Sequence, residues 1–265
     1  MKFALSATRL TLCLAALAVV AGCSSPAFND KDSAEKLYAD ARDEMASGNY
    51  EKAIKILERV EGRAAGSILA QQAAIDMAYA QWRSGERAAA LSTLDRFIKI
   101  HPSSPALDYA MYLKGIVNFN DNLGIMSSIS RQDISERDQQ ASRDAYQSFK
   151  QLVDQFPDSK YSADARVRMD YIVNALAQYE LHVARYYYRR GAFLAAANRA
   201  QYTVREYQQT PSVEEALYIL AQSYDKLGLT DLRDDADRVL KANYPDSRFM
   251  REGIRKRDTP WWVFW

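Results

Sequence analysis

Hydrophobic and polar residues follow a helical period along most of this 265-residue chain. Between Leu217 and Tyr224, for example, large and small apolar residues recur every three or four positions, so they share one face of an α-helix. Only ten glycines and seven prolines interrupt this pattern. Because a β-sandwich or barrel needs many more turns, we expect an all-α fold.

Glycine and proline recur at fixed distances and divide the helical pattern into hairpins. Gly48 and Gly85 are 37 residues apart, and Gly191 and Gly228 are separated by the same 37 residues. A proline stands 17 residues after Gly85, and another stands 17 residues after Gly228. Glycine accepts the positive φ that ends a first helix, and proline stops a second one. A helical hairpin of about this length is the tetratricopeptide repeat.

We therefore predict an all-α tetratricopeptide-repeat solenoid of about five helical hairpins with a closing C-terminal helix. The first helix of the third repeat is expected to run to about Asn120, and an interruption at 121–137 follows it. The fourth repeat is expected to begin with a long helix over 163–190. The predicted repeats span 33–66, 68–103, 104–158, 159–210 and 211–247, and the closing helix spans 248–257.

Local signals refine the hairpins. Small residues five positions after the turn glycine should let the paired helices approach closely, at Ala53, Ala90 and Ala196. Ser104 and Pro105 predict a cap and the first residue of the next helix. Ser159 and Ser247, each just after a proline and an aspartate, predict two further N-caps.

The N-terminus has the pattern of a secretory signal. Lys2 and Arg9 precede an apolar run of twelve residues at 10–21, which is too short for a bilayer core that needs about 20. The run ends in Val20-Ala21-Gly22-Cys23, which resembles the bacterial lipobox. We interpret 1–22 as a lipoprotein signal peptide, Cys23 as the lipid attachment site and 23–32 as a flexible tether. A plain signal peptide or an anchor helix that contains a cysteine is the alternative.

Charge and cysteine content limit the possible partners. The 35 basic residues, less Lys2 and Arg9, leave 33 against 34 acidic residues, so no global charge favours nucleic acid or anionic lipid. Cys13 would leave with the signal, so Cys23 has no partner for a disulfide within the chain. Attachment to a membrane would depend on the N-terminal lipid.

The residues that carry catalysis show no recognisable pattern. His101 and His182 lie in unrelated contexts, and no nucleophile elbow, phosphate loop or dinucleotide-binding motif is present. We predict that the protein is not an enzyme and uses neither a cofactor nor a metal. A cell-wall enzyme, or its regulator, with a pair of carboxylates hidden among the scattered acidic residues remains an alternative.

Seventeen tyrosines and four tryptophans favour protein interfaces. One candidate set falls on first-helix positions that line the groove of such repeats, and we predict that it binds an extended peptide: Tyr38, Arg42, Tyr79, Trp82, Arg83 and Tyr109. Packing between repeats, or solvated charge for the arginines, is the alternative. A second set, Tyr187, Arg190 and Arg199, combines aromatic rings with cations in the fourth repeat. It predicts another protein interface, for which Arg199 is the sharpest candidate; a surface arginine is the alternative.

Together these features resemble the BamD family, the ComL-type lipoproteins of the outer-membrane β-barrel assembly machinery. The resemblance rests on the lipobox, the five repeats, the interrupted third repeat with Arg137-Asp138, Asp108-Tyr109-x-Met111-Tyr112-x-Lys114-Gly115 and Tyr186-Tyr187-x-x-Arg190-Gly191-Ala192. It implies a lipid-anchored protein on the periplasmic face of the outer membrane. It also implies that C-terminal repeats bind the periplasmic domains of the β-barrel core assembly subunit, while N-terminal repeats bind unfolded outer-membrane proteins or accessory lipoproteins.

Two points remain open. The same fold would suit a pilotin-type lipoprotein for secretin or pilus assembly. The tail at 258–265, which ends in Pro260-Trp261-Trp262-Val263-Phe264-Trp265, departs from the family pattern. We expect it to dock on the core subunit or on the protein's own surface. A membrane-interface anchor and a disordered end are the alternatives.

Overall fold

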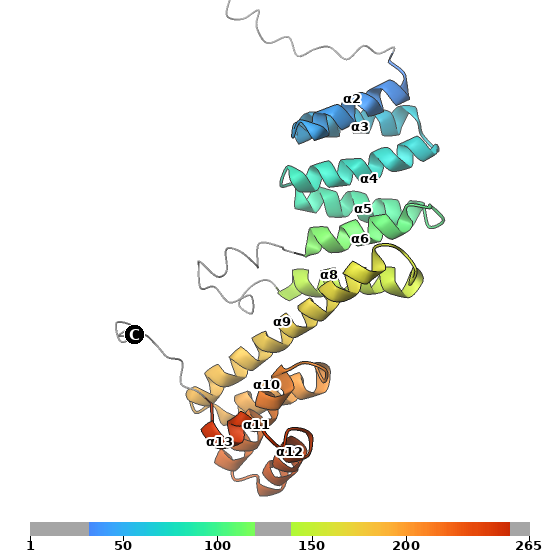
Figure 1. Ribbon diagram of the computed structural model, residues 1–265. Helices are drawn as coiled ribbons and strands as arrows, with labels where there is room; N and C mark the ends of the chain where they lie inside the picture. The colour runs from blue at the N-terminus through green and yellow to red at the C-terminus, as the bar shows by residue number, and fades with distance from the viewer. Residues whose placement is uncertain (1–31, 120–138, 255–265) are drawn as a thin grey trace, which may run out of the picture. The chain divides into compact units, whose positions relative to one another are not determined.

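The computed structural model describes residues 32–119 and 139–254, and every regular element within these ranges is an α-helix (Figure 1). The chain divides into two compact units, one ending at Ala73 and the other beginning at Ala74. Several predictions concern residues outside the described ranges: the signal peptide, Cys23, the interruption at 121–137 and the aromatic tail at 258–265. None of the described helices is both long enough and apolar enough to cross a membrane.

The first unit contains a helical hairpin. Helices α2 (Ala34–Ala46) and α3 (Tyr50–Arg63) pack against each other, and α4 (Ile68–Arg83) begins in this unit. The Ser33 hydroxyl caps α2 by accepting a hydrogen bond from the Lys36 amide at 3.3 Å. Gly48, with φ of 79°, makes the turn between the two helices. Ala53 is fully buried on α3, as the prediction of close helix packing requires.

The second unit continues the same arrangement. Helices α5 (Arg87–Ile100), α6 (Leu107–Asn118) and α8 (Gln139–Gln155) follow the end of α4, and α6 packs against both α5 and α8. Next come α9 (Ser162–Arg189), α10 (Phe193–Glu206), α11 (Ser212–Lys226) and α12 (Thr230–Asn243). The short α13 (Arg248–Glu252) packs against α11. The helix order therefore confirms the predicted hairpins of a tetratricopeptide-repeat fold.

The turn residues explain why the hairpins close where they do. Gly85, Gly191 and Gly228 have φ values of 90°, 77° and 72°, which residues with a Cβ adopt at a cost. The alanines five positions after two of them, Ala90 and Ala196, are fully buried in the adjacent helices. Both observations confirm the sequence predictions about the turns.

Helix α9, with 28 residues, is the longest of the described helices, and its two halves belong to different core clusters. Its first half contributes Ala165 and Ile172 to a cluster with α6 and α8. Its second half contributes Leu181 and Ala184 to a cluster with α10, α11 and α12. Figure 1 shows α9 continuing from α8 towards α10 and α11.

Two predicted helix starts were wrong. Helix α6 begins at Leu107, because Ser104 accepts a hydrogen bond from the Ala106 amide and the preceding residues form tight turns instead of helix. Similarly, Tyr161 is the N-cap of α9, and the Ser159 hydroxyl instead accepts from the Tyr161 amide and donates to Asp108. In both cases a side-chain bond inside the turn replaced the predicted cap.

The ends of two helices also differ from the prediction. Helix α6 ends at Asn118, slightly before the predicted Asn120. The closing helix ends at Glu252 instead of residue 257, because Gly253 adopts a φ of 69° and stops it. The N-cap predicted for this closing helix is confirmed, since the Ser247 hydroxyl accepts from the Phe249 amide at 3.3 Å.

Candidate interaction surfaces

A row of aromatic side chains begins on α4. The rings of Tyr79 and Trp82 meet edge to face, with centroids 5.9 Å apart. The Arg83 guanidinium donates a hydrogen bond to the Tyr79 hydroxyl at 2.7 Å and lies 5.7 Å from the centre of that ring. Three residues of the predicted peptide groove therefore form one contact group on the last turns of α4.

The row continues on α6. Tyr109 lies 5.2 Å from the ring of Tyr161, and Tyr112 stacks on the same ring at 4.9 Å. Burial raises the pKa of Tyr109, and the nearby Tyr161, Asp76 and Tyr79 raise it further. Tyr79, Trp82 and Tyr109 all pack against the same core cluster, so the α4 and α6 parts of the row lie next to each other.

Charged groups border the far end of the row. The Tyr112 hydroxyl donates to Asp164 at 2.7 Å, and Arg168 donates to the same carboxylate oxygen at 2.6 Å. Burial, followed by this hydrogen bond, raises the pKa of Tyr112 to about 12. Burial alone would raise the pKa of Asp164, but the hydrogen bonds from Arg168 and Tyr112 outweigh it and lower that pKa. Arg168 also lies 5.0 Å from the ring centre of Phe119.

We call this series the aromatic row, and it consists of Tyr79, Trp82, Tyr109, Tyr112, Phe119, Tyr161 and Tyr171. Most of its residues are half-buried, so part of each side chain packs in the protein and part is open to solvent. Trp82, for example, packs against two core clusters, and Tyr171 is 40% exposed. These aromatic residues therefore do pack between repeats, which was the alternative to peptide binding. Their side chains nevertheless remain partly exposed.

Two of the predicted groove residues belong to the first unit, which is described by itself. Tyr38 is half-buried and Arg42 is exposed, and both lie on α2 in the first unit. Their place beside the aromatic row remains a prediction. Sequence reasoning missed Tyr161 and the Asp164–Arg168 pair as members of the site. Asp164 and Arg168 are four residues apart on α9, a spacing that indicates an ion pair. Nothing in the sequence indicated the contact of Asp164 with Tyr112, 52 residues earlier.

The second predicted interface lies where α9 turns into α10. Tyr187 is half-buried and packs against the alanine-rich core, and its ring meets that of Tyr186 edge to face at 5.7 Å. Arg190 is exposed, with its guanidinium 5.5 Å from the ring centre of Tyr186. Tyr186 is itself 46% exposed. These residues form an accessible aromatic and cationic surface.

Arg199 already has a partner within the chain. Its Nη1 donates to Oε2 of Glu180 at 2.9 Å, and the Glu180 side chain is only 3% exposed. The hydrogen bond with Glu180 raises the pKa of Arg199. The guanidinium thus neutralises a buried carboxylate on α9 while 46% of its own side chain remains exposed.

A second buried carboxylate was not predicted. Arg185 on α9 forms two hydrogen bonds with Glu215 on α11. Its Nε donates to Oε1 of the carboxylate, and its Nη2 donates to Oε2. The Glu215 side chain is 8% exposed, and that of Arg185 is 33% exposed. This bidentate pair joins α9 to α11, so the C-terminal repeats contain two ion pairs on buried glutamates.

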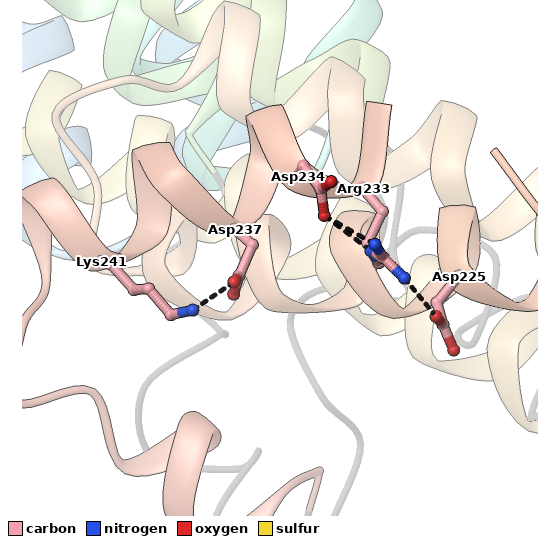
Figure 2. A network of polar contacts seen from close by, with 5 residues as sticks. All are labelled: Asp225, Arg233, Asp234, Asp237 and Lys241. Carbon is pink, nitrogen blue, oxygen red and sulfur yellow. Dashed lines mark hydrogen bonds and ion pairs between the residues drawn. The ribbon is translucent and has the colours of Figure 1, made fainter. Parts of the chain in front are cut away.

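An exposed polar network covers part of the last hairpin (Figure 2). Arg233 on α12 contacts Asp225 on α11 at 3.3 Å and Asp234 on its own helix at 2.8 Å. One helical turn further on, Lys241 pairs with Asp237. A charged outer face is expected of a repeat that no other described repeat covers.

Within the described ranges, no group of three or more histidine, cysteine, aspartate or glutamate residues could hold a metal ion. His101 instead packs its ring 5.1 Å from that of Phe97.

Comparison with known proteins gives a consistent result. A family model described as "Outer membrane lipoprotein" (YfiO) matches residues 30–240. The outer membrane protein assembly factor BamD of Neisseria meningitidis serogroup B is 46% identical over 253 residues, which cover 93% of this chain and 95% of that protein. The BamD of Xylella fastidiosa is 35% identical over 245 residues, covering 91% and 84%. The crystal structure of MamA covers 81% of this chain and 96% of its own at 14% identity, with a TM-score of 0.33, a likeness too distant to inform the fold.

Proposed function

This chain belongs to the BamD family of outer membrane lipoproteins, and we propose that it is a non-enzymatic scaffold of the β-barrel assembly complex. Outer membrane protein assembly is the function that family membership supports. We further propose that two surfaces bind different partners. The aromatic row binds client polypeptides, and the surface around Tyr187, Arg190 and Arg199 binds the core barrel subunit.

The aromatic row carries this proposal. Its rings are held by packing on one side, so little side-chain entropy is lost when a ligand covers the other side. Aromatic rings with polar tips suit an extended peptide, since they offer apolar area and hydrogen-bonding groups together. Asp164 and Arg168 add both signs of charge at one end. Unfolded outer-membrane proteins or accessory lipoproteins are the proposed ligands.

For the second surface, we propose that the periplasmic domains of the core subunit contact Tyr187, Arg190 and Arg199. Arg190 is the cleaner residue for testing, because a change at Arg199 would also leave Glu180 without its partner. We propose attachment to the outer membrane through lipid on Cys23, with the repeats in the periplasm. Two or more acyl chains would hold the protein durably, whereas one chain alone is marginal.

Mild detergent extraction of the full lipidated chain from its own cells tests the proposal. We expect a barrel protein with periplasmic repeats to co-purify, and Arg190→Ala to reduce its yield several-fold without changing the melting temperature. Recovery of a secretin instead would support the pilotin-type alternative.

The row is tested separately by cross-linking. Tyr79→Ala with Trp82→Ala should weaken cross-linking to a peptide from an unfolded barrel protein, while the core subunit still co-purifies. An exposed ion pair on α12, removed by Arg238→Ala with Asp235→Ala, is the matched control. Loss of both activities together with a lower melting temperature would show that these aromatics only pack the repeats.

A further inference from the structure

Asp108 lies on the first turn of α6, immediately before Tyr109 of the aromatic row. Its side chain is half-buried and accepts hydrogen bonds through both carboxylate oxygens. Oδ1 accepts from the backbone amide of Tyr109 at 2.7 Å, and Oδ2 accepts from the Ser159 hydroxyl at 2.7 Å. Asp108 therefore connects α6 with the turn that precedes α9, 51 residues later in the chain.

Ser159 extends this connection to Tyr161. Its hydroxyl donates to Asp108 and accepts from the backbone amide of Tyr161 at 3.2 Å. A serine hydroxyl has one donor and two acceptor sites, so it can form both bonds at once. A continuous chain of three hydrogen bonds thus joins the backbone amide of Tyr109 to that of Tyr161. The rings of these two tyrosines are 5.2 Å apart.

The backbone of the turn between α8 and α9 is held by short-range bonds. The Ser159 amide, for example, donates to the Phe156 carbonyl at 3.1 Å. A bond that spans three residues shapes the turn but does not fix it relative to α6. The hydrogen bond with Asp108 supplies that longer-range constraint. It is also charge-assisted, so it is stronger than a bond between neutral groups.

Tyr161 is the ring on which the α6 part of the aromatic row converges. It contacts Tyr109 at 5.2 Å and stacks on Tyr112 at 4.9 Å. The hydrogen bond between Tyr112 and Asp164 also links α6 to α9, but it lies beyond the turn, on the helix itself. The turn determines where the Tyr161 ring stands. A ring held in one place loses less entropy when a ligand covers it than a mobile ring does.

The turn that precedes α6 provides an internal comparison. The Ser104 hydroxyl accepts from the Ala106 amide at 3.3 Å, the same two-residue pattern as that of Ser159 and Tyr161. Among the described residues, no carboxylate is bonded to Ser104. This kind of turn therefore forms without a carboxylate partner. The bond from Ser159 to Asp108 is not required to close the turn, and its effect is on where the turn lies.

We propose that Asp108 is a positioning residue of the aromatic row: through Ser159 it holds the ring of Tyr161 against the rings on α6, across the boundary between two hairpins. Asp108 acts through this link and not by contact with a ligand. Its effect on client binding rests on the proposed function of the row, whereas its effect on the position of Tyr161 does not.

Fluorine NMR measures the position of the ring directly. 3-Fluorotyrosine is introduced at position 161 of the full lipidated chain in detergent. We expect the neighbouring rings to displace its resonance from that of the free amino acid. Asp108→Ala and Ser159→Ala should each move the resonance towards the free position. Ser159→Thr, which keeps the hydroxyl, should leave it in place, and so should Ser104→Ala, the matched control.

Binding of a fluorescent peptide from an unfolded barrel protein tests the consequence for the row. Asp108→Ala and Ser159→Ala should each weaken binding by about threefold or more, because Tyr161 loses its fixed position. The double variant should bind no more weakly than either single variant, since both changes remove the same link. Ser159→Thr and Ser104→Ala should bind as the unaltered chain does.

Three outcomes would overturn the proposal. An unchanged resonance in both alanine variants would show that packing alone holds Tyr161. Additive effects in the double variant would show that Asp108 and Ser159 act separately. An equal change in Ser104→Ala would make the effect one of turn stability in general. The serine variants decide the question even where Asp108→Ala does not fold.

The two readouts also separate this proposal from the proposed function. If the unaltered chain does not bind the peptide while the resonance responds as expected, client binding by the row is wrong and the positioning of Tyr161 by Asp108 stands.

Discussion

The two halves of α9 are held by different kinds of contact. The first half packs against α6 and α8 through large side chains, among them Phe149, which is fully buried against the backbone of Gly115. The second half packs against α10, α11 and α12 through a core in which alanine is the commonest residue. Two ion pairs on buried glutamates also involve this second half: Glu180 of α9 pairs with Arg199 of α10, and Arg185 of α9 pairs with Glu215 of α11.

This difference shows that side-chain shape and buried charge each determine the register of one part of a long helix. Large interlocking side chains define a single fit, because a shifted register would leave cavities or clashes. Alanines allow close approach but differ little from one another, so they define register weakly. Ion pairs on buried carboxylates supply a constraint that small side chains cannot, since an unpaired buried charge is costly. We expect the two halves to respond to different substitutions.

The largest effect is expected from Arg185→Met, which leaves the Glu215 carboxylate buried without its partner. Removing one member of a buried pair typically destabilises by about 3 kcal/mol. The double variant Arg185→Met with Glu215→Leu should recover most of that loss, because an apolar pair of similar volume is often close to neutral. Urea denaturation, together with amide hydrogen exchange in α9–α11, measures both.

An equal loss in the single and double variants would show that the packing of these side chains, and not the uncompensated charge, stabilises the C-terminal repeats.

Gly115→Ala, on α6, should be the most destabilising small substitution in the core that holds the first half of α9. A Cβ at this position would lie 2.6 Å from Cδ1 of Phe149 and closer still to Cε1, in a core with no room for the ring to move. Overpacking of this kind costs about 2 kcal/mol, measurable as a lower denaturation midpoint. Gly62→Ala is the matched control, because nothing lies within 4 Å of its Cβ. That change should stabilise α3 by up to about 1 kcal/mol.

A milder effect should come from the Tyr112–Asp164 hydrogen bond. Burial, followed by the hydrogen bond to Asp164, raises the pKa of Tyr112 from 10.0 to about 12 on folding. The stability linked to this hydroxyl is therefore fully present below pH 10 and is lost as the pH rises through 12. Tyr112→Phe should remove that step and cost about 1 kcal/mol at neutral pH, while the ring stacked on Tyr161 remains. Denaturation midpoints between pH 8 and pH 12 test this. An unchanged pH profile in Tyr112→Phe would assign the alkaline loss to other tyrosines.

The smallest effect is expected from Arg233→Gln in the exposed network of the last hairpin (Figure 2). Its partners Asp225 and Asp234 have side chains 44% and 68% exposed, so water already screens the pair. The loss of stability should be the smallest of the series and disappear as salt is added. A loss as large as that of Arg185→Met, measured at the same ionic strength, would contradict the distinction between buried and exposed pairs.

The amino-acid sequence by itself determined the helices and their turns. Apolar periodicity, the glycines at the turns and the prolines after the second helices all act over a few residues, so they can be recognised without coordinates. The same local signals predicted that Tyr79, Trp82 and Tyr109 fall on first helices. Where a side-chain hydrogen bond competed with a cap, as at Ser104 and Ser159, the local prediction of the helix start was wrong.

Only the tertiary structure decided which charges are buried and which rings meet. Glu180 and Glu215 are ordinary helical glutamates in sequence, and their burial depends on α10 and α11 covering α9. Tyr112 reaches Asp164 across 52 residues, a contact that no periodicity encodes. Local patterns specify elements, whereas the free energy of burying a charge or stacking a ring depends on neighbours distant in the chain.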